Sequence, residues 1–154
     1  MNIRDLVRPE WIRAQLSVSD QNEAIDALSE LLERDGVVKP GFRSAVKDRE
    51  LGFPTGLPTS GTKVALPHTG AEHVYRSAVA IATLVTPVSF RVMGNPDDTV
   101  DVRIVFLLAI ADRESQVHAL SQLVEIVQEE EILKSMLLAP DSTEVHRAIT
   151  RIIG

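Results

Sequence analysis

The chain has 154 residues, an apolar fraction of 44% and a net charge of -6, which are ordinary values for one globular domain. It contains no cysteine, which excludes disulfides, a thiolate nucleophile and cysteine-based zinc or iron–sulfur sites. The acidic balance, the lack of a Lys/Arg cluster and the presence of one Trp and one Tyr argue against nucleic acid as a partner.

The N-terminus lacks the pattern of a targeting segment. Arg4, Asp5 and Arg8 interrupt the region where a signal peptide has an apolar run. The longest apolar stretch, residues 104–111, is far shorter than the ~20 residues of a membrane helix. We therefore expect a cytoplasmic, soluble protein that does not insert into the membrane.

Two helices are predicted in the first third of the chain. The first covers residues 20–36, because Asp20 is a suitable N-cap, Glu23 follows three residues later and Gly36 is a stop signal. Its apolar face is predicted to consist of Ala24, Ile25, Ala27, Leu28, Leu31 and Leu32. The second helix is predicted from residue 40 or 41 to about residue 51, and its inward residues would be Phe42, Ala45 and Val46.

Strands follow in the middle of the chain. Residues 53–62 are rich in Pro, Gly and Thr, which predicts a turn-rich loop. A short strand is predicted over residues 63–67, ended by its proline. Residues 77–85 and 88–92 predict a pair of strands interrupted at Thr86-Pro87, and residues 100–110 predict a long strand whose second half is apolar enough to be buried.

Three helices are predicted at the end, over residues 114–128, near 130–138 and after an Asp141 cap. Their apolar faces would comprise Val117, Leu120, Leu123, Val124 and Val127 in the first, and Val145, Ala148, Ile149 and Ile152 in the last. Helices before and after a block of strands predict the α/β class. We expect a single-domain sandwich over residues 1–154, with a mixed, mostly parallel sheet flanked by helices.

His68 is the foremost candidate for a reactive side chain. It directly follows a predicted strand beside the Gly/Thr-rich loop, and Lys63 is the only formal charge between residues 51 and 71. Neutral imidazole dominates for an ordinary histidine at cytosolic pH, and without nearby carboxylates it suits attack on phosphorus. Backbone N–H groups around Gly56 and Gly61 are suited to hold an anion. The alternative is a loop histidine without a function.

The other histidines are less distinctive. His118 is predicted on the polar face of its helix, either as an ordinary surface histidine or, near a helix N-terminus, as part of an anion site. His73 follows His68 too closely along an extended loop to share a phosphate without a turn, and its role stays open. His146 is expected at the surface, and the Glu129–131 run is expected to be a solvated corner. No His-x-x-x-His pattern occurs, so neither a metal nor another cofactor is expected.

Several segments resemble the fructose/mannitol-type enzyme IIA family of the sugar phosphotransferase system. Residues 64–69, Val-Ala-Leu-Pro-His-Thr, are similar to its Pro-His segment, and residues 48–50, Asp-Arg-Glu, end a helix before a Thr/Gly turn as in that family. His118, followed by Leu120 and Leu123, is similar to its second histidine motif. Residues 50–57, Glu-Leu-Gly-Phe-Pro-Thr-Gly-Leu, look most like the galactitol-type branch. The resemblance covers nearly the whole chain.

This resemblance implies roles for three residues. His68 would carry the phosphoryl group, and His118 and Arg49 would stabilise it. A cation such as Arg49 in the last turn of a helix is also favourable without any function. The donor implied is the phosphohistidine of HPr and the acceptor a cysteine of enzyme IIB, for uptake of a sugar or polyol, with galactitol as the candidate. The protein itself would not bind the sugar. An uncharged docking surface is expected near Phe53, Leu57 and Leu66.

Two rival interpretations remain open. A regulatory enzyme IIA of the nitrogen-related type would use the same His68 chemistry to control its binding to other proteins, although the Phe53-Pro54-Thr55-Gly56 turn argues mildly against it. A small ligand-binding module would carry out no phosphoryl chemistry. Phosphorylation separates the second from the others, and neighbouring enzyme IIB and IIC genes separate transport from regulation.

Overall fold

A computed structural model describes the backbone of residues 2–153 and the side chains of residues 2–151. Its helices are α1 (Ile3–Leu6), α2 (Gln21–Arg34), α3 (Phe42–Gly52), α4 (Arg113–Ile126), α5 (Glu130–Leu138) and α6 (Ser142–Ile153), with a 3₁₀ turn η1 (Ala71–His73). The strands are β1 (Val7–Leu16), β2 (Gly56–Leu57), β3 (Lys63–Ala65), β4 (Ala78–Val92) and β5 (Asn95–Ala109).

One mixed sheet forms the middle layer of the molecule. β1 pairs in parallel with β4, and β3 in parallel with β5. β4 and β5 form a long antiparallel hairpin, while the short β2 pairs antiparallel with β3 and touches β4 at Gly56 and Val92. The α/β class with a mixed sheet is therefore confirmed. Three of the five pairings are parallel, but the longest is antiparallel.

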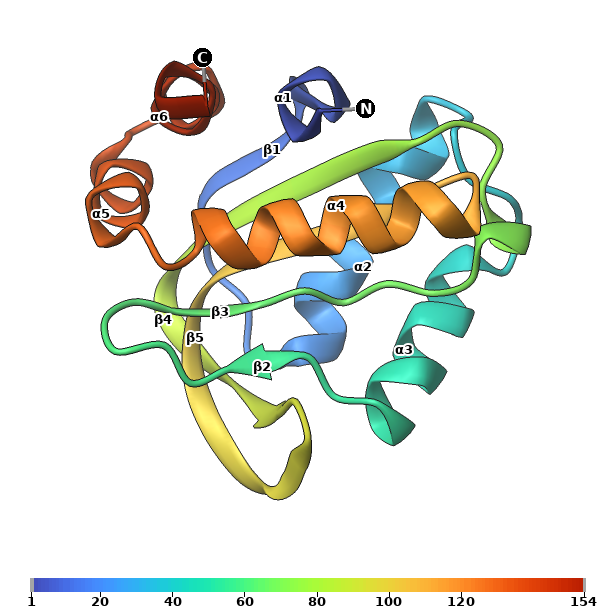
Figure 1. Ribbon diagram of the computed structural model, residues 1–154, viewed down its shortest axis with the longest axis horizontal. Coiled ribbons are helices and arrows are strands. Elements are labelled where there is room, and N and C mark those ends of the chain that lie inside the picture. Colours follow the sequence, from blue (N-terminus) through green and yellow to red (C-terminus); the bar gives the residue numbers. More distant parts are fainter. Residues whose placement is uncertain (1, 154) are drawn as a thin grey trace.

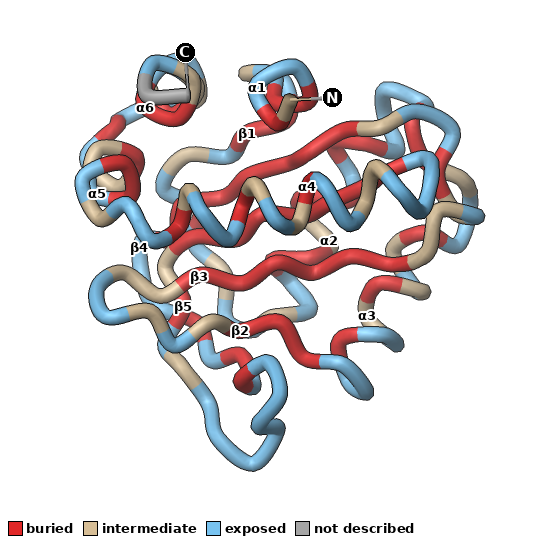
Figure 2. Tube along the Cα trace, viewed as in Figure 1, coloured by how far each residue is buried: buried red, intermediate tan, exposed pale blue. Residues whose placement is uncertain are grey.

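Each face of the sheet has its own apolar core. α2 and α3 cover one face, where they pack on alternate strand residues such as Ala80 and Leu107. α1, α4, α5 and α6 cover the other face, where they pack on the intervening residues such as Ile81 and Phe106. Figure 1 shows this arrangement, with α4 lying across the front, and Figure 2 shows the central strands buried between the two helical layers.

The predicted helices are confirmed, and their caps follow the local sequence signals. The N-cap Asp20 accepts a hydrogen bond from Glu23 N at 2.9 Å, and Glu23 Oε2 accepts one from Ser19 N at 2.6 Å. This is a variant of the capping box in which the Glu side chain reaches the residue before the N-cap. Asp141 Oδ1 accepts from Glu144 N at the start of α6. The side chain of Ile152, which was expected on the apolar face of α6, lies outside the described residues.

The strands differ from expectation in two places. α1 and β1 have no counterpart among the predicted elements, because the charged residues of β1 obscure its buried positions, which include Trp11 and Ile12. β4 also continues through Thr86-Pro87 instead of stopping there. A register shift lies between Thr83 and Val88, and this irregularity leaves the proline on an exposed stretch where no ladder bond is lost.

Across residues 2–153, the structure contains no helix that is both long and apolar enough to cross a bilayer.

Candidate functional site

His68 lies directly beyond β3, at the point where Pro67 leaves the strand. The chain is held there by a 3.0 Å hydrogen bond from Leu108 N to Pro67 O and by a parallel bridge between His68 and Leu108 of β5. The imidazole is 9% exposed, and its Nδ1 lies 2.8 Å from Leu66 O. A carbonyl oxygen can only accept, so Nδ1 carries the proton and the lone pair is on Nε2.

His68 forms part of the wall of a hollow of about 780 Å³ between three segments of the chain. Arg49 comes from the end of α3, and residues 68–72 come from the turn after β3. The N-terminal half of α4 forms the remaining side. Its lining residues are Arg113, Gln116, Val117 and Leu120.

The surroundings of His68 favour its neutral form. Burial is the main cause that lowers the pKa of the imidazole below its usual value, the hydrogen bond to Leu66 O opposes this effect, and the positive charge of Arg49 lowers the pKa further. A buried imidazole with a free Nε2 lone pair is a nucleophile that stays unprotonated at neutral pH.

Arg49 brings a positive charge to the hollow from the last turn of α3. Its guanidinium lies 4.9 Å above the ring of Phe53, and no carboxylate among the described residues forms an ion pair with it. Asp48 and Glu50, the carboxylates beside it in the chain, do not hold it. The structure therefore brings Arg49 and His68 to one hollow, and their roles in phosphoryl transfer stay a prediction.

On α4, residues other than His118 face the hollow. Gln116 Nε2 donates a 2.8 Å hydrogen bond to Thr69 O, next to His68, and Arg113 lies one turn before it. Neither residue was a candidate from the sequence. Their signal would have been their positions, because Arg113 lies four residues before Val117 and Gln116 lies four residues before Leu120, on the same flank of the helix.

His118 is exposed and does not line the hollow. The helix is oriented by the buried Ala119 and Leu123, and the same outward flank carries Gln122, which accepts a hydrogen bond from Ile3 N. His118 therefore lies on the flank of α4 toward α1, away from His68. The phosphate-stabilising role that the resemblance implies for it stays a prediction, which this placement does not favour.

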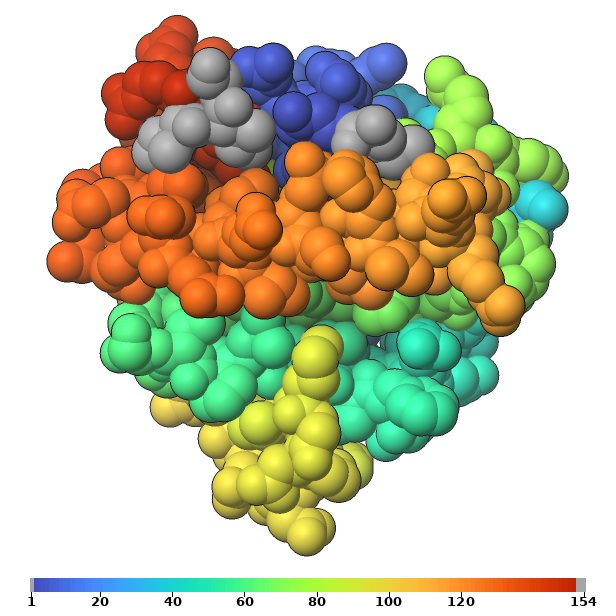
Figure 3. All heavy atoms as spheres, in the orientation of Figure 1, coloured from blue at the N-terminus to red at the C-terminus, as the bar shows by residue number. Residues whose placement is uncertain are grey.

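The apolar face expected for α4 is partly wrong. Val117 is 64% exposed and Val124 is 37% exposed, although both were expected in the core. They lie along the seam between α4 and the segment that contains β2 and β3, which Figure 3 shows as the border between the orange band and the green chain below it. Val117 thus leaves apolar surface uncovered at the hollow of His68, and Val124 does so farther along the seam.

The remaining site expectations have mixed outcomes. Gly56 and Gly61 do not line the hollow of His68. His73 belongs to η1, with its Nε2 3.6 Å from Glu72 Oε1. His146 is half-buried rather than at the surface, because its Nε2 lies 3.2 Å from Val7 O on the neighbouring β1.

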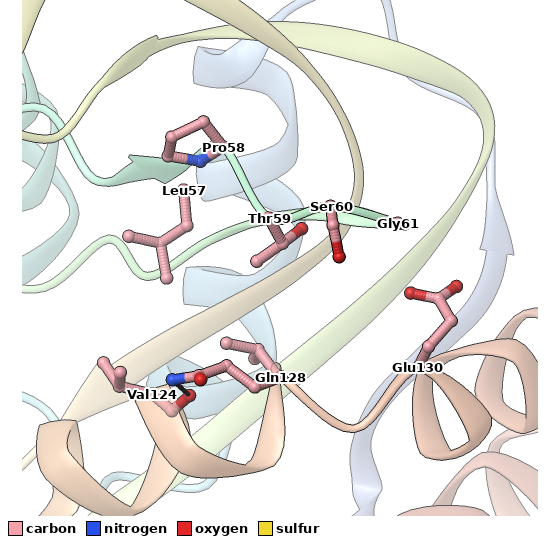
Figure 4. Close-up of a pocket in the computed structure, with 9 residues that line it drawn as sticks. Leu57, Pro58, Thr59, Ser60, Gly61, Val124, Gln128 and Glu130 are labelled. Carbon is pink, nitrogen blue, oxygen red and sulfur yellow. Dashed lines mark hydrogen bonds between the residues drawn. The ribbon is translucent and has the colours of Figure 1, made fainter.

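A second hollow, of about 440 Å³, lies farther along the same seam. The β2–β3 turn forms one side and the end of α4 the other, as Figure 4 shows. Residues 129–131 were expected to be a solvated corner, but Glu130 has partners in the protein. Its carboxylate accepts hydrogen bonds from Thr62 N at 2.9 Å and Thr62 Oγ1 at 2.8 Å. No histidine lines this hollow. Residues 2–151 contain no grouping of His, Asp and Glu side chains that could hold a metal ion.

Comparisons with known proteins show the family and the fold of the chain. Residues 5–152 match the family described as "Phosphoenolpyruvate-dependent sugar phosphotransferase system, EIIA 2". The galactitol-specific EIIA component of Escherichia coli K12 is 26% identical over 132 residues, which cover 86% of this chain and 87% of that protein. The solution structure of the mannitol-specific cryptic enzyme IIA CmtB of Escherichia coli is similar with a TM-score of 0.79 and 25% identity, over 98% of this chain and 99% of that one.

Two further structures share the fold at lower identity. The IIA component in an Escherichia coli complex of mannitol enzyme IIA with phosphorylated enzyme IIB has a TM-score of 0.77 at 24% identity, over 95% and 99% of the two chains. The nitrogen regulatory protein IIA-Ntr of Neisseria meningitidis has a TM-score of 0.73 at 22% identity, over 96% and 99%. With almost its whole length matched by the family, the chain belongs to the EIIA 2 family of the phosphoenolpyruvate-dependent sugar phosphotransferase system.

Proposed function

We propose that His68 Nε2 accepts a phosphoryl group from the phosphohistidine of HPr and passes it to a cysteine of enzyme IIB. The observation that carries this proposal is the 2.8 Å contact of Nδ1 with Leu66 O, which leaves the Nε2 lone pair free in a hollow that a partner can reach. In the first transfer, a bond forms between Nε2 and phosphorus while the donor's nitrogen–phosphorus bond breaks and returns its electron pair to that nitrogen.

Charge around the hollow supports such a transfer. Phosphoryl transfer depends mainly on in-line positioning and on stabilising charge on the three equatorial oxygens. Arg49 and Arg113 provide two guanidinium groups from opposite sides of the hollow, and a guanidinium can hold phosphate oxygens by paired hydrogen bonds. The Gln116 amide, now bonded to Thr69 O, lies close enough to redirect its N–H groups toward a phosphate.

The rim of the hollow is suited to transient docking. Val117 lines the hollow and is 64% exposed, and Phe53, which lies against the Arg49 guanidinium, is 66% exposed. Leu51, in the last turn of α3, adds a third apolar side chain that is 57% exposed. Leu66, which was expected to contribute, is fully buried and serves the core instead. HPr and enzyme IIB would use this rim in turn, each bringing its own reactive side chain to His68, so the contact must be small and reversible.

The carrier would act in the cytoplasm for the uptake of a sugar or polyol, and the similarity to galactitol-specific EIIA components favours galactitol. The sugar itself need not touch this protein. The regulatory alternative shares the His68 chemistry, and its support here is a likeness in fold to IIA-Ntr at 22% identity. The transport interpretation therefore has the stronger support.

The test is incubation with enzyme I, HPr and phosphoenolpyruvate, followed by intact-mass measurement. One phosphoryl group should be added, labile to acid and stable to base, as expected for a nitrogen–phosphorus bond. His68→Ala should remove it, whereas His73→Ala, a histidine five residues away, should not. A phosphoryl group retained by His68→Ala would refute the assignment. Onward transfer to the galactitol enzyme IIB then separates transport from regulation.

A further inference from the structure

A series of hydrogen bonds, joined through the backbone of Leu66, connects the end of α3 with His68. Glu50 Oε2 accepts from Thr55 N at 2.8 Å, and Glu50 Oε1 accepts from Thr55 Oγ1 at 2.9 Å. Thr55 Oγ1 in turn accepts from Leu66 N at 3.1 Å, and Leu66 O accepts from His68 Nδ1 at 2.8 Å. Glu50, Thr55 and Leu66 are 3%, 3% and 0% exposed, so no solvent interrupts this series.

The burial of Glu50 is costly, which indicates that its position has a use. Burial raises the pKa of its carboxyl group to about 7, although both hydrogen bonds from Thr55 act to lower it. No cation among the described residues forms an ion pair with Glu50. Because both oxygens are bonded to Thr55, the contacts of this carboxyl group act only on the turn between α3 and β2.

Thr55 is held from its other side as well. A Cβ at the neighbouring Gly56 would lie 2.6 Å from Arg91 O, so only glycine lets the turn approach β4 this closely. Leu66 lies one residue beyond the end of β3. Its N–H is directed at Thr55, through Oγ1 at 3.1 Å and O at 3.4 Å. The position of Leu66, and with it the carbonyl that bonds to His68, therefore depends on Thr55.

We propose that Glu50 and Thr55 are positioning residues for His68, which fix Leu66 so that its carbonyl holds the Nδ1–H and directs the Nε2 lone pair into the hollow. This inference rests on the phosphocarrier function proposed above. When the nitrogen–phosphorus bond forms, the imidazole ring becomes positively charged, and the carbonyl of Leu66 stabilises that charge through the Nδ1–H hydrogen bond. A displaced carbonyl would allow the other tautomer, in which Nε2 carries the proton and cannot attack.

The first experiment reads the tautomer of His68 by ¹⁵N NMR of the unphosphorylated protein. Wild type should show the Nδ1–H tautomer, and Thr55→Val, which removes the hydroxyl at nearly constant shape, should show a mixture. Thr55→Ser restores the hydroxyl and should restore the tautomer. The matched control is Thr83→Val, because Thr83 is 1% exposed and its Oγ1 also anchors a backbone N–H, that of Gln15 at 2.8 Å, but on β1.

The second experiment measures phosphorylation rates with HPr charged by enzyme I and phosphoenolpyruvate. In Thr55→Val, kcat should fall between about tenfold and a hundredfold, the range expected for a misplaced reacting group. KM should be unchanged, because the exposed apolar residues proposed to contact HPr are intact. Glu50→Gln has one acceptor oxygen in place of two, so its kcat should lie between those of wild type and Thr55→Val. It provides a second variant if Thr55→Val does not fold.

The two experiments test the positioning role separately from the phosphocarrier function. A wild-type protein that accepts no phosphoryl group would refute that function, while the tautomer measurement would still decide whether Thr55 positions the ring. An unchanged Nδ1–H tautomer in folded Thr55→Val, or an unchanged kcat, would overturn the positioning role. An equal effect of Thr83→Val would also overturn it, because the loss would then be a general one.

Discussion

His68 combines burial with a nearby cation, and both have the same effect on its protonation. Burial, as the larger cause, and the charge of Arg49 each lower the pKa of the imidazole, against the opposing bond to Leu66 O. Between the lowered folded pKa and pH ~6.5, the unfolded chain therefore binds a proton that the folded chain does not. This group contributes stability above that pH and loses it as the pH falls through the lower folded value.

An NMR titration of the His68 ring should therefore have its midpoint below the ~6.5 of a free histidine. In Arg49→Gln the midpoint should rise, but it should stay below that reference because burial remains. Arg13→Gln, which changes an exposed arginine on β1 at the far edge of the sheet, should leave the midpoint where it is. A wild-type midpoint above the free value would show that the site stabilises the charged imidazole instead.

The contribution of α4 rests on individual residues of one helix. Gln116→Ala should slow phosphorylation about tenfold by leaving the turn around Thr69 without its anchor, and should cost about 1 kcal/mol of stability for the lost hydrogen bond. His118→Ala should leave the phosphorylation rate and the stability at their wild-type values within measurement error, since a surface change costs at most ~0.5 kcal/mol. Phosphorylation kinetics and urea unfolding of both variants provide the check.

The His118→Ala variant also decides between the role that the family resemblance implies for His118 and the absence of a role that its position in the structure implies. The family resemblance implies that removing His118 slows transfer to enzyme IIB, whereas its exposed position on the flank toward α1 implies no effect. If His118→Ala slows the transfer and Gln116→Ala leaves it at the wild-type rate, the role predicted for His118 is restored.

At the level of elements, the site depends on how closely the α3–β2 turn approaches the β4–β5 hairpin. Gly56, the first residue of β2, is hydrogen-bonded to the hairpin, because its carbonyl oxygen accepts from Met93 N at 2.8 Å. Its missing side chain leaves room for Arg91 O, a backbone atom that cannot move without the strand. The sequence placed this glycine in a loop and made it a candidate for holding an anion, and it gave no sign of the close approach to β4.

Gly56→Ala should therefore destabilise the protein by about 1–3 kcal/mol, the usual cost of inserting a methyl group into a packed site. Phosphorylation should also slow, because the turn carries Thr55. Gly52→Ala, at the end of α3 with nothing within 4 Å of the added Cβ, should be neutral or slightly stabilising. Urea unfolding of both variants measures the difference, and equal stabilities would contradict the close approach seen at Gly56.

For the whole molecule, Glu50 makes stability depend on pH in a defined direction. Its carboxyl has a usual pKa of 4.5 and a folded value of about 7, raised by burial. Between these values the native state keeps a proton that the unfolded chain has lost, so stability falls as the pH rises. The stabilising contribution is present in full below the lower value and is lost through the upper one.

Glu50→Gln has no such titration. Its stability relative to wild type should therefore be higher at about pH 8 than at about pH 5, by ~2 kcal/mol. Glu125→Gln, an exposed carboxylate on α4, should follow wild type at both pH values. Urea unfolding at the two pH values gives the comparison. A constant difference between wild type and Glu50→Gln would mean that the carboxyl group is ionised throughout and has a partner.

The sequence by itself determined the features that depend on neighbouring residues. Caps such as Asp20 and periodic apolar faces specify helices locally, because the hydrogen bonds of a helix join residues four positions apart. The segment from Val64 to Thr69 indicated the family, which the family match confirms. It also made His68 the candidate nucleophile, and the turn after Arg49 made that residue a second site candidate.

Only the tertiary structure decided what depends on distant contacts. β1 was not predictable because its pairing with β4 joins residues about seventy positions apart, and its own pattern is irregular. The rotation of α4 depends on Ala119 and Leu123 packing on the sheet, and that rotation turns Gln116 toward His68 and His118 away. The burial of Glu50 depends in the same way on Thr55 and Leu66, which approach it only when the turn, the strand and the helix are packed together.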